Sequence, residues 1–378
     1  MKVIIIIVFF IILVLILIYL FQKFNNKCSN KLQNNELAGP KFLYRRRDNC
    51  GYYLPECLKI FFADNQILSE DTVENKKSSQ IIYVPCLYDD TDMEISQMPK
   101  TKNNFYMIIN KCDIFVGKNH LWNFLEQKYK EQVTNFLPKS YLPYRPESIE
   151  QLKKDYEPNK LYIMKKNLQR QEGIKITSNY EELINNKDQE IIIIQELLQN
   201  PFLVNGRKIN LRVYVLQVIY NDKSYIYVYD DGFMYYTPEY FKKGSMDISR
   251  NITTGYIDRQ VYVDNPLTHE DFRNYLGQAR SQIIFENIRN LMRDVLEPYQ
   301  KQLIQIQSFP GSVQFQIFGA DVAINEDMSA LLMEINKGPD LNYKDERDGA
   351  LKKKLLRDIF VTIGIVESDK NNKFILVN

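Results

Sequence analysis

Histidine is scarce in this sequence, and several familiar catalytic motifs are missing from it. The 378 residues include only two histidines, His120 and His269. This count argues against a His-rich metal site and against a catalytic triad that depends on histidine. The sequence also contains no Gly-x-Gly-x-x-Gly, Walker A or Gly-x-Ser-x-Gly motif. Any nucleotide or acyl chemistry must therefore use a different arrangement of residues.

Cysteine is also limited, because the chain has five cysteines and all of them precede residue 113. An odd number of cysteines without Cys-x-x-Cys spacing indicates neither a disulfide framework nor a zinc site. We therefore expect reduced cytosolic thiols at Cys28, Cys50, Cys57, Cys86 and Cys112.

Charge of one sign does not dominate the chain, whose formal net charge is +2. A composition of 45% hydrophobic and 25% charged residues is that of a globular protein. The length allows two or three compact units. Because no global positive field exists, no nucleic-acid partner is predicted. The oligomeric state is not readable from the sequence, and a monomer is the default expectation.

One long apolar run is present, from residue 3 to residue 21. As a helix it would extend roughly 28 Å at ~1.5 Å per residue, enough to cross a membrane. The run is longer than a signal-peptide core and lacks small residues at its end, which favours an uncleaved anchor. Residues 1–22 are predicted to be a transmembrane anchor, and residues 23–40 a polar linker.

The basic residues near this run predict its orientation. Lys2 precedes it, whereas four lysines and Arg45-Arg46-Arg47 follow it. The expected protein is thus a single-pass membrane protein whose body faces the cytosol. An Asn251-Ile-Thr253 glycosylation sequon is weak evidence for the opposite orientation.

Strand-like and helix-like segments alternate along the chain, so the fold class is α/β or α+β with mixed sheets. Strands are predicted at 81–84, 107–109, 161–164, 191–194, 209–220 and 225–229, with a turn beginning at Asp230. Helices are predicted at 121–136, 148–154 and 180–185. Thr268 and Asp271 have the spacing of a capping box that opens a helix. Ile284, Ile288, Leu291 and Val295 have the helical spacing of a core-facing stripe.

Two segments bring polar side chains to one face of a strand. Lys208, Asn210 and Arg212 alternate with apolar residues, and Glu334 and Asn336 are also two apart. With Asp321 from a preceding strand, the second group forms an all-oxygen set suited to Mg²⁺ bound by phosphate. The first group would hold the phosphates themselves. This combination indicates a nucleotide-using enzyme.

Between about Asn110 and Leu341, an ordered set of motifs resembles the tubulin tyrosine ligase-like family, whose members have an ATP-grasp fold. The motifs are Cys112-Asp-Ile-Phe-Val-Gly-Lys118 with Leu121-Trp122, Asn135-Phe-Leu-Pro-Lys-Ser140, Tyr162-Ile-Met-Lys165, Gly173-Ile174, Gln195-Glu-Leu-Leu198, Pro201-Phe-Leu-Val-Asn-Gly-Arg-Lys208, Asp231-Gly232 and the Asp321/Glu334/Asn336 set. The resemblance implies a divergent, membrane-anchored member with an N-terminal α/β domain (41–140), a central ATP-grasp domain (141–200) and a C-terminal ATP-grasp domain with the metal site (201–378).

The resemblance also implies roles for individual residues. ATP would be bound by Lys165, Gly173, Ile174, by the hinge residues Gln195, Glu196, Leu197 and Leu198, and by Lys208 and Asn210. Asp321, Glu334 and Asn336 would hold Mg²⁺. Arg212 and Glu334 would be catalytic, and Arg212, Thr253 and Thr254 would contact substrate.

Several positions depart from the family pattern. Lys166 stands in place of a proline, Asn210 replaces an Asp, and Asp340 stands where the pattern has a serine. No arginine follows Asp231-Gly232, where Tyr235 and Tyr236 lie instead. Two outcomes are open: one of the nearby cationic residues Lys243, Arg250 or Arg259 supplies a replacement charge, or the enzyme uses a different nucleophile.

The implied function is an ATP- and Mg²⁺-dependent ligase that adds a free amino acid to a protein carboxylate through an acyl phosphate. Tubulin is the first acceptor to consider. The alternatives are a catalytically degenerate ATP-grasp protein that binds nucleotide and tethers a partner at a membrane, and a ligase that joins small molecules.

Overall fold

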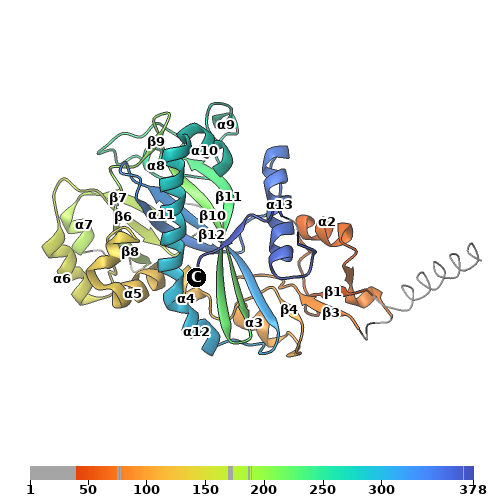
Figure 1. Ribbon diagram of the computed structural model, residues 1–378. Coiled ribbons are helices and arrows are strands. Elements are labelled where there is room, and N and C mark those ends of the chain that lie inside the picture. The colour runs from red at the N-terminus through yellow and green to blue at the C-terminus, as the bar shows by residue number, and fades with distance from the viewer. Residues whose placement is uncertain are drawn as a thin grey trace, which may run out of the picture.

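Two β-sheets form the framework of the protein (Figure 1). The computed structural model describes residues 40–378 except 75, 77, 169–172, 186, 187, 189 and 369. The main sheet has ten strands in the order β14-β11-β10-β12-β4-β3-β1-β2, with β13 paired to β12 and β9 paired to β10. The smaller sheet has the order β5-β8-β6-β7. Parallel and antiparallel pairs occur together in the main sheet, so the predicted mixed α/β class is confirmed.

The strands have the following bounds. They are β1 (Phe42–Arg45), β2 (Leu68–Ser69), β3 (Gln80–Tyr83), β4 (Phe105–Tyr106), β5 (Ser140–Tyr141), β6 (Tyr162–Lys166), β7 (Ile174–Thr177), β8 (Ile191–Glu196), β9 (Leu203–Val204), β10 (Arg207–Tyr220), β11 (Lys223–Tyr236), β12 (Val313–Ile324), β13 (Ala330–Lys337) and β14 (Phe374–Leu376).

The helices that carry the packing are α2 (Glu56–Asp64), α3 (Thr91–Ser96), α4 (Asp113–Val116), α5 (Lys118–Tyr129), α6 (Pro146–Asp155), α7 (Tyr180–Ile184), α8 (Ile248–Asn251), α9 (Val261–Asp264), α10 (His269–Leu276), α11 (Gln278–Leu296), α12 (Gln300–Gln305) and α13 (Glu346–Thr362). Short 3₁₀ turns occupy Glu70–Thr72, Lys130–Asn135 and Glu297–Tyr299.

The long strands β10, β11 and β12 form the centre of the main sheet. Along β10, Ile209, Leu211 and Val213 are buried in the main core, as their period of two predicts. Helix α11 packs near this region and buries the predicted stripe of Ile284, Ile288, Leu291 and Val295. The helix before it begins with the predicted capping box, in which Thr268 and Asp271 exchange side-chain and backbone hydrogen bonds.

The smaller sheet, drawn at the left of Figure 1 with α5, α6 and α7, has two different faces. One face buries Tyr162, Met164 and Ile194 in a cluster that also contains Leu152 of α6 and Leu183 of α7. Because side chains alternate along β6, Ile163 and Lys165 point to the opposite face. That face is the one on which the candidate site is built.

Several predicted elements have different bounds in the structure; the helix expected at 121–136 is α5, which ends at Tyr129, followed by the 3₁₀ turn Lys130–Asn135. The strand expected at 107–109 is instead β4 at Phe105–Tyr106, although Met107, Ile108 and Ile109 are buried. The turn expected from Asp230 is wrong, because β11 continues to Tyr236. Pairing of Val213 with Gly232 and of Arg212 with Phe233 keeps this segment extended.

The expectation of reduced thiols is wrong for two of the five cysteines. Cys50 and Cys86 form a disulfide that links the segment after β1 to the segment after β3. No spacing in the sequence predicts this pair, since the two residues are brought together by the parallel pairing of β1 and β3. Cys57 and Cys112 are free and buried, and Cys28 lies outside the described residues.

The expectation of a single-pass membrane protein is also corrected. None of the helices that the structure describes is long and apolar enough to cross a membrane. Residues 3–21 and the linker 23–40, apart from its last residue, lie outside the described part of the chain. The sequon at Asn251 is inaccessible, because this side chain is 1% exposed and its Nδ2 donates to the carbonyls of Ser245 and Asp247.

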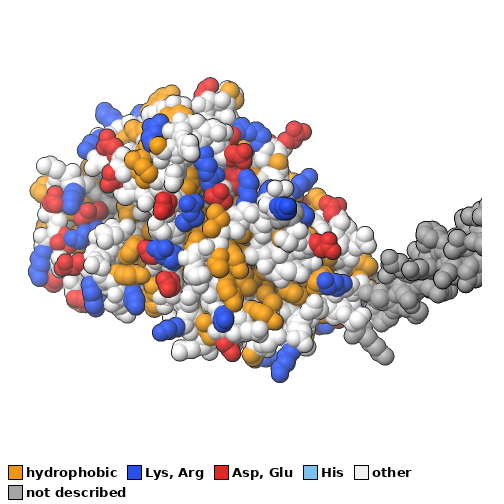
Figure 2. Space-filling model, viewed as in Figure 1, with side chains coloured by type: hydrophobic (Ala, Val, Ile, Leu, Met, Phe, Trp, Pro, Cys, Tyr) orange, Lys and Arg blue, Asp and Glu red, His pale blue; other side chains and the backbone are white. Residues whose placement is uncertain are grey.

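The three predicted body domains remain a prediction. Strands β1, β3 and β4 from the 41–140 region join the same sheet as β10–β12, and α2 packs against α13 through stacked Phe61 and Phe360 at 4.6 Å. On the face shown in Figure 2, basic and acidic side chains are interspersed without a large patch of one sign.

Candidate functional site

Two buried lysines, one from each sheet, form no close ion pair among the described residues, although Glu334 acts on Lys165 from farther away. Lys165 of β6 donates to Oε1 of Gln195 at 2.5 Å, and Gln195 in turn donates to Ser140 Oγ at 2.8 Å. Lys208 of β10 donates to the carbonyl of Leu198 at 3.3 Å. Burial lowers the pKa of Lys165 to about 8, and burial together with Lys165 lowers the pKa of Lys208 to about 7. Such a pair is suited to an anionic ligand.

The predicted metal residues lie together at one edge of this region. Asp321 of β12 pairs in register with Glu334 of β13, and Asn336 Nδ2 donates to Glu334 Oε1 at 3.1 Å. Burial and the neighbouring Glu334 raise the pKa of Asp321 to about 6, against the attraction of Arg212. Two carboxylates and an amide thus converge, as their spacing predicts.

Lys118, at the start of α5, also reaches this edge, and sequence reasoning gave it no role. Its Nζ lies 3.7 Å from Oε2 of Glu334. Burial would raise the pKa of Glu334, but Lys118, Asn336 and Lys165 together hold it below its ordinary value. With Lys165, Lys208 and Arg212, the site has four cations around two carboxylates. The positive excess matches a polyphosphate. The only signal in the sequence was the place of Lys118 in the Cys112–Lys118 motif.

Arg212 lies between the phosphate side of the site and a small cavity beside Tyr235. Its Nε and Nη2 bond the two oxygens of Asp321 at 2.6 and 3.1 Å, and its guanidinium lies 5.0 Å from the ring centre of Tyr235. Burial opposes the charge of Arg212, but Asp321 raises its pKa above the ordinary value. A Cβ on Gly319 would lie 3.0 Å from Arg212, so glycine leaves the path that this side chain follows.

The hinge residues and Asn210 fit the expected nucleotide site only in part. The amides of Glu196 and Leu197 already donate to the carbonyls of Lys139 and Leu161, at 2.8 Å each, so these two groups are not free to read adenine. Oδ1 of Asn210 is buried and has no hydrogen-bond partner among the described residues, which leaves an acceptor for a ligand hydroxyl.

Gly173 and Ile174 border the nucleotide side at the β6–β7 turn. Ile174 pairs with Lys165, and Gly173 has φ +67° with Lys166 packed where a Cβ would lie. Residues 169–172 of this loop lie outside the described part.

The expected substrate residues lie beside Tyr235. Thr254 donates its amide to the carbonyl of Tyr236 at 3.1 Å, Thr253 precedes it, and Gly255 packs on the Tyr235 ring. Gly255 and Tyr256, together with Arg212, line a cavity of about 120 Å³, whereas the expected substrate residues Thr253 and Thr254 do not line it.

Of the three candidates for the missing charge, Arg259 lines that cavity. Lys243 instead donates to Asn200 at 2.8 Å, and Arg250 to the carbonyl of Tyr240 at 3.0 Å. For Lys243 and Arg250, the prediction from the sequence is therefore not supported.

A groove of about 1790 Å³ beside the hinge contains Leu197, Leu198 and Trp122 but none of the four cations. The phosphate-binding site is defined by the four cations and their hydrogen bonds, because the size of a groove does not by itself indicate phosphate binding.

The donor set fits Mg²⁺. Oxygen ligands from two carboxylates and one amide are the kind that this ion takes together with phosphate. The neighbouring charge of Glu334 helps to raise the pKa of Asp321, and a divalent ion would relieve this repulsion. Among the described residues no group of three or more His, Cys, Asp or Glu side chains is placed so that it could hold a metal ion. A nitrogen- or sulfur-rich metal site is therefore not indicated by the part of the chain that the structure describes.

Comparison with known proteins now identifies the chain. The model of the tubulin-tyrosine ligase family matches residues 96–373. This chain belongs to the tubulin-tyrosine ligase family. The predicted resemblance is thereby confirmed at the level of the family, and the mixed α/β architecture is consistent with the ATP-grasp fold expected for it.

Several curated members of the tubulin-tyrosine ligase family are similar to this chain. A protein named probable tubulin polyglutamylase TTLL9 from Mus musculus is 28% identical over 190 residues, which are 48% of this chain and 39% of that protein. Tubulin monoglutamylase TTLL4 from Mus musculus is 23% identical over 274 residues, 66% of this chain and 22% of that protein. Tubulin polyglutamylase TTLL7 from Xenopus tropicalis is 26% identical over 274 residues, 66% of this chain and 29% of that protein. The chain thus spans less than half the length of these relatives.

The lowered pKa values of Lys165 and Lys208 predict a pH dependence of ATP binding. Phosphate oxygens stabilise the charged lysines, so binding raises both pKa values and the complex holds more protons than the free protein. We expect proton uptake when Mg²⁺·ATP binds between about pH 7 and 9, and an affinity that falls as pH rises above about 7. Calorimetry in two buffers of different ionisation enthalpy measures the uptake.

Lys165→Ala is the matched variant for this measurement. It should weaken ATP binding by about 2 kcal/mol, as for one charged contact, and should reduce the proton uptake. If wild type and Lys165→Ala release equal numbers of protons, or if neither exchanges protons on binding, these lysines do not contact the phosphates.

Proposed function

We propose that this chain is an ATP- and Mg²⁺-dependent ligase that adds an amino acid to a carboxylate of a protein. The observation that carries the proposal is the arrangement of Lys165 and Lys208, which are buried and form no close ion pair among the described residues, next to the Asp321/Glu334/Asn336 set. Unpaired buried cations are costly, so an anionic ligand would supply the missing charge.

In the proposed reaction, the γ-phosphoryl group of ATP passes to an oxygen of the acceptor carboxylate, and ADP leaves. The amine of the amino acid then attacks the acyl carbon, an amide bond forms, and phosphate and a proton are released. Arg212 would stabilise the negative charge that develops on the transferred group. Mg²⁺ held by Asp321, Glu334 and Asn336 would neutralise phosphate charge.

Tubulin is the proposed acceptor, and L-glutamate is the first donor to test. The support is that the three relatives described above are named tubulin polyglutamylases or a monoglutamylase. Those matches are at 23–28% identity over part of each protein, so the donor must be measured directly.

The test is incubation of the full chain with tubulin, ATP, Mg²⁺ and single amino acids, followed by intact-protein mass spectrometry of tubulin. We expect mass increases equal to one or more amino-acid residues, and ADP release only when tubulin is present. Tight ATP binding without any ligation would favour a catalytically degenerate nucleotide-binding protein, and absence of ATP binding would overturn the assignment of the site.

A further inference from the structure

The strand that carries Asn336 is fixed at its end by residues that are distant in the sequence. Lys337 is the next residue of β13, and its side chain leaves the strand on the face opposite to Asn336. Its Nζ donates to Oδ1 of Asp113 in α4 at 2.7 Å and to the backbone carbonyl of Asp89 at 3.3 Å. The end of β13 is therefore tied both to α4 and to the segment 86–90.

The segment 86–90 also packs directly on the residue that follows Lys337. Gly338 has φ +64°, and a Cβ there would lie 2.7 Å from Cδ2 of Tyr88, so the tyrosine ring lies against the glycine backbone. The Tyr88 hydroxyl donates to the carbonyl of Met107 at 2.9 Å, which holds the ring in place. The position of the segment 86–90 thus sets the path of the chain immediately after Asn336.

A disulfide and one buried carboxylate hold the segment 86–90 itself. Cys86 is bonded to Cys50 in the loop after β1. Its backbone amide donates to Oε2 of the buried Glu94 at 2.9 Å, and the amide of Leu87 donates to Oε1 of the same side chain at 3.3 Å. Reduction of the disulfide would remove the covalent part of this anchor and leave the hydrogen-bonded part.

The Cys50 end of the disulfide is the one that a reductant reaches. Cys50 is partly exposed and lies between the exposed residues Asn49 and Gly51, whereas Cys86 is buried. A thiolate of a small dithiol would attack the Cys50 sulfur, and Cys86 would leave and take up a proton. The second thiol of the reductant then closes its own disulfide and releases Cys50. The chain gains two thiols, and the dithiol is oxidised by two electrons.

We propose that the Cys50–Cys86 disulfide controls the magnesium end of the site, and that Lys337 is the positioning residue that carries its effect to Asn336. The inference rests on the ligase function proposed above, which places Mg²⁺ on Asn336 and two carboxylates. With the disulfide closed, the segment 86–90 is tethered and the end of β13 is fixed. With the disulfide open, the segment gains conformational freedom, the ligand at the strand end is less well oriented, and Mg²⁺ binds more weakly.

The first test measures ATP binding to the full chain by calorimetry, with and without Mg²⁺, before and after reduction with dithiothreitol. Alkylation and mass spectrometry count the free thiols, and thermal unfolding shows that each sample is folded at the assay temperature. We expect reduction to raise the Kd for Mg²⁺·ATP about fivefold or more, and to leave ATP binding without Mg²⁺ within about twofold. Cys50→Ser should behave as the reduced chain does and should not respond to dithiothreitol.

The second test separates the position of Lys337 from its charge. Loss of a nearby positive charge would by itself strengthen the binding of a cation. We expect Lys337→Met instead to weaken Mg²⁺·ATP binding about tenfold, as for residues that orient metal ligands, and to reduce the response to dithiothreitol. Lys337→Arg should restore most of the affinity. Lys111→Met is the matched control, because Lys111 also pairs with an aspartate at 2.7 Å, but in α3, and it should change nothing.

Equal Mg²⁺·ATP affinity of the oxidised and reduced chains would overturn the inference while the ligase function stands. Unchanged or tighter binding in Lys337→Met would overturn it in the same way, because the clamp would then not position the ligand. If the oxidised wild type binds ATP equally with and without Mg²⁺, the magnesium site of the proposed function fails, and the inference fails with it.

Discussion

Glu334→Gln is expected to reduce ligation at least about a hundredfold and to leave the fold and stability unchanged. Charge stabilisation lost at one position of a reaction centre costs about 10²–10³ in rate. Glu334 is the acid that meets Asp321 across the strand pair, that receives the amide of Asn336 and that lies near Lys118. Glutamine keeps the shape of the side chain and removes only its charge.

The measurement is the rate of ADP release and of tubulin mass increase at saturating ATP and Mg²⁺, with circular dichroism and thermal unfolding as checks of the fold. Glu326→Gln is the control, because Glu326 is an exposed acid in the turn between β12 and β13. ATP binding in the presence of Mg²⁺ should weaken in Glu334→Gln but not in Glu326→Gln. Ligation near the wild-type rate would remove Glu334 from the reaction centre.

The sequence predicted those parts of the site that depend on local geometry. Because side chains alternate along a strand, Lys208 is expected on the same face as Arg212, and Glu334 on the same face as Asn336, independently of the rest of the fold. The structure confirms this for Glu334 and Asn336, whose side chains are joined by a hydrogen bond. Order along the chain then identified the family, which the family comparison confirms.

The remaining parts depend on contacts between residues far apart in the sequence. Arg212 meets Asp321 across 109 positions, and Lys118 meets Glu334 only because α5 begins at the edge of β13. The disulfide of Cys50 and Cys86 was missed for the same reason.

Gly232→Ala is expected to destabilise the protein by about 3 kcal/mol or more, a cost typical of severe overpacking. Gly232 lies in β11 opposite Val213, in the segment that composition alone assigns to a turn. A Cβ there would overlap the carbonyl oxygen of Arg212 and would lie 2.5 Å from Cε1 of the buried His269. Backbone on one side and a packed ring on the other leave little room to adjust.

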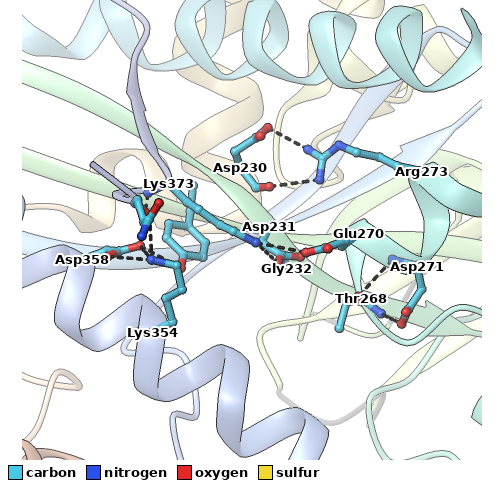
Figure 3. Close-up of polar contacts among 12 residues, drawn as sticks. Asp230, Asp231, Gly232, Thr268, Glu270, Asp271, Arg273, Lys354, Asp358 and Lys373 are labelled. Carbon is cyan, nitrogen blue, oxygen red and sulfur yellow. Dashed lines mark hydrogen bonds and ion pairs between the residues drawn. The ribbon is translucent and has the colours of Figure 1, made fainter. Parts of the chain in front are cut away.

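The surroundings of Gly232 are fixed from several directions, as Figure 3 shows. Its amide donates to Asp231, whose carboxylate receives Lys373 at 2.8 Å. Next to it, Asp230 receives Arg273 at 2.7 Å. Movement of β11 to admit a methyl group would therefore break contacts with α10 and with the segment before β14.

Denaturant unfolding of Gly232→Ala and of Gly51→Ala measures the effect. Gly51 is exposed and has nothing within 4 Å of its Cβ position, so its variant should stay within about 0.5 kcal/mol of wild type. Because the overlap is with the backbone of Arg212, any Gly232→Ala protein that does fold should also lose ligation activity. Equal stability of the two variants would mean that β10 and β11 separate easily at this point, and that Arg212 is not held by the strand pair.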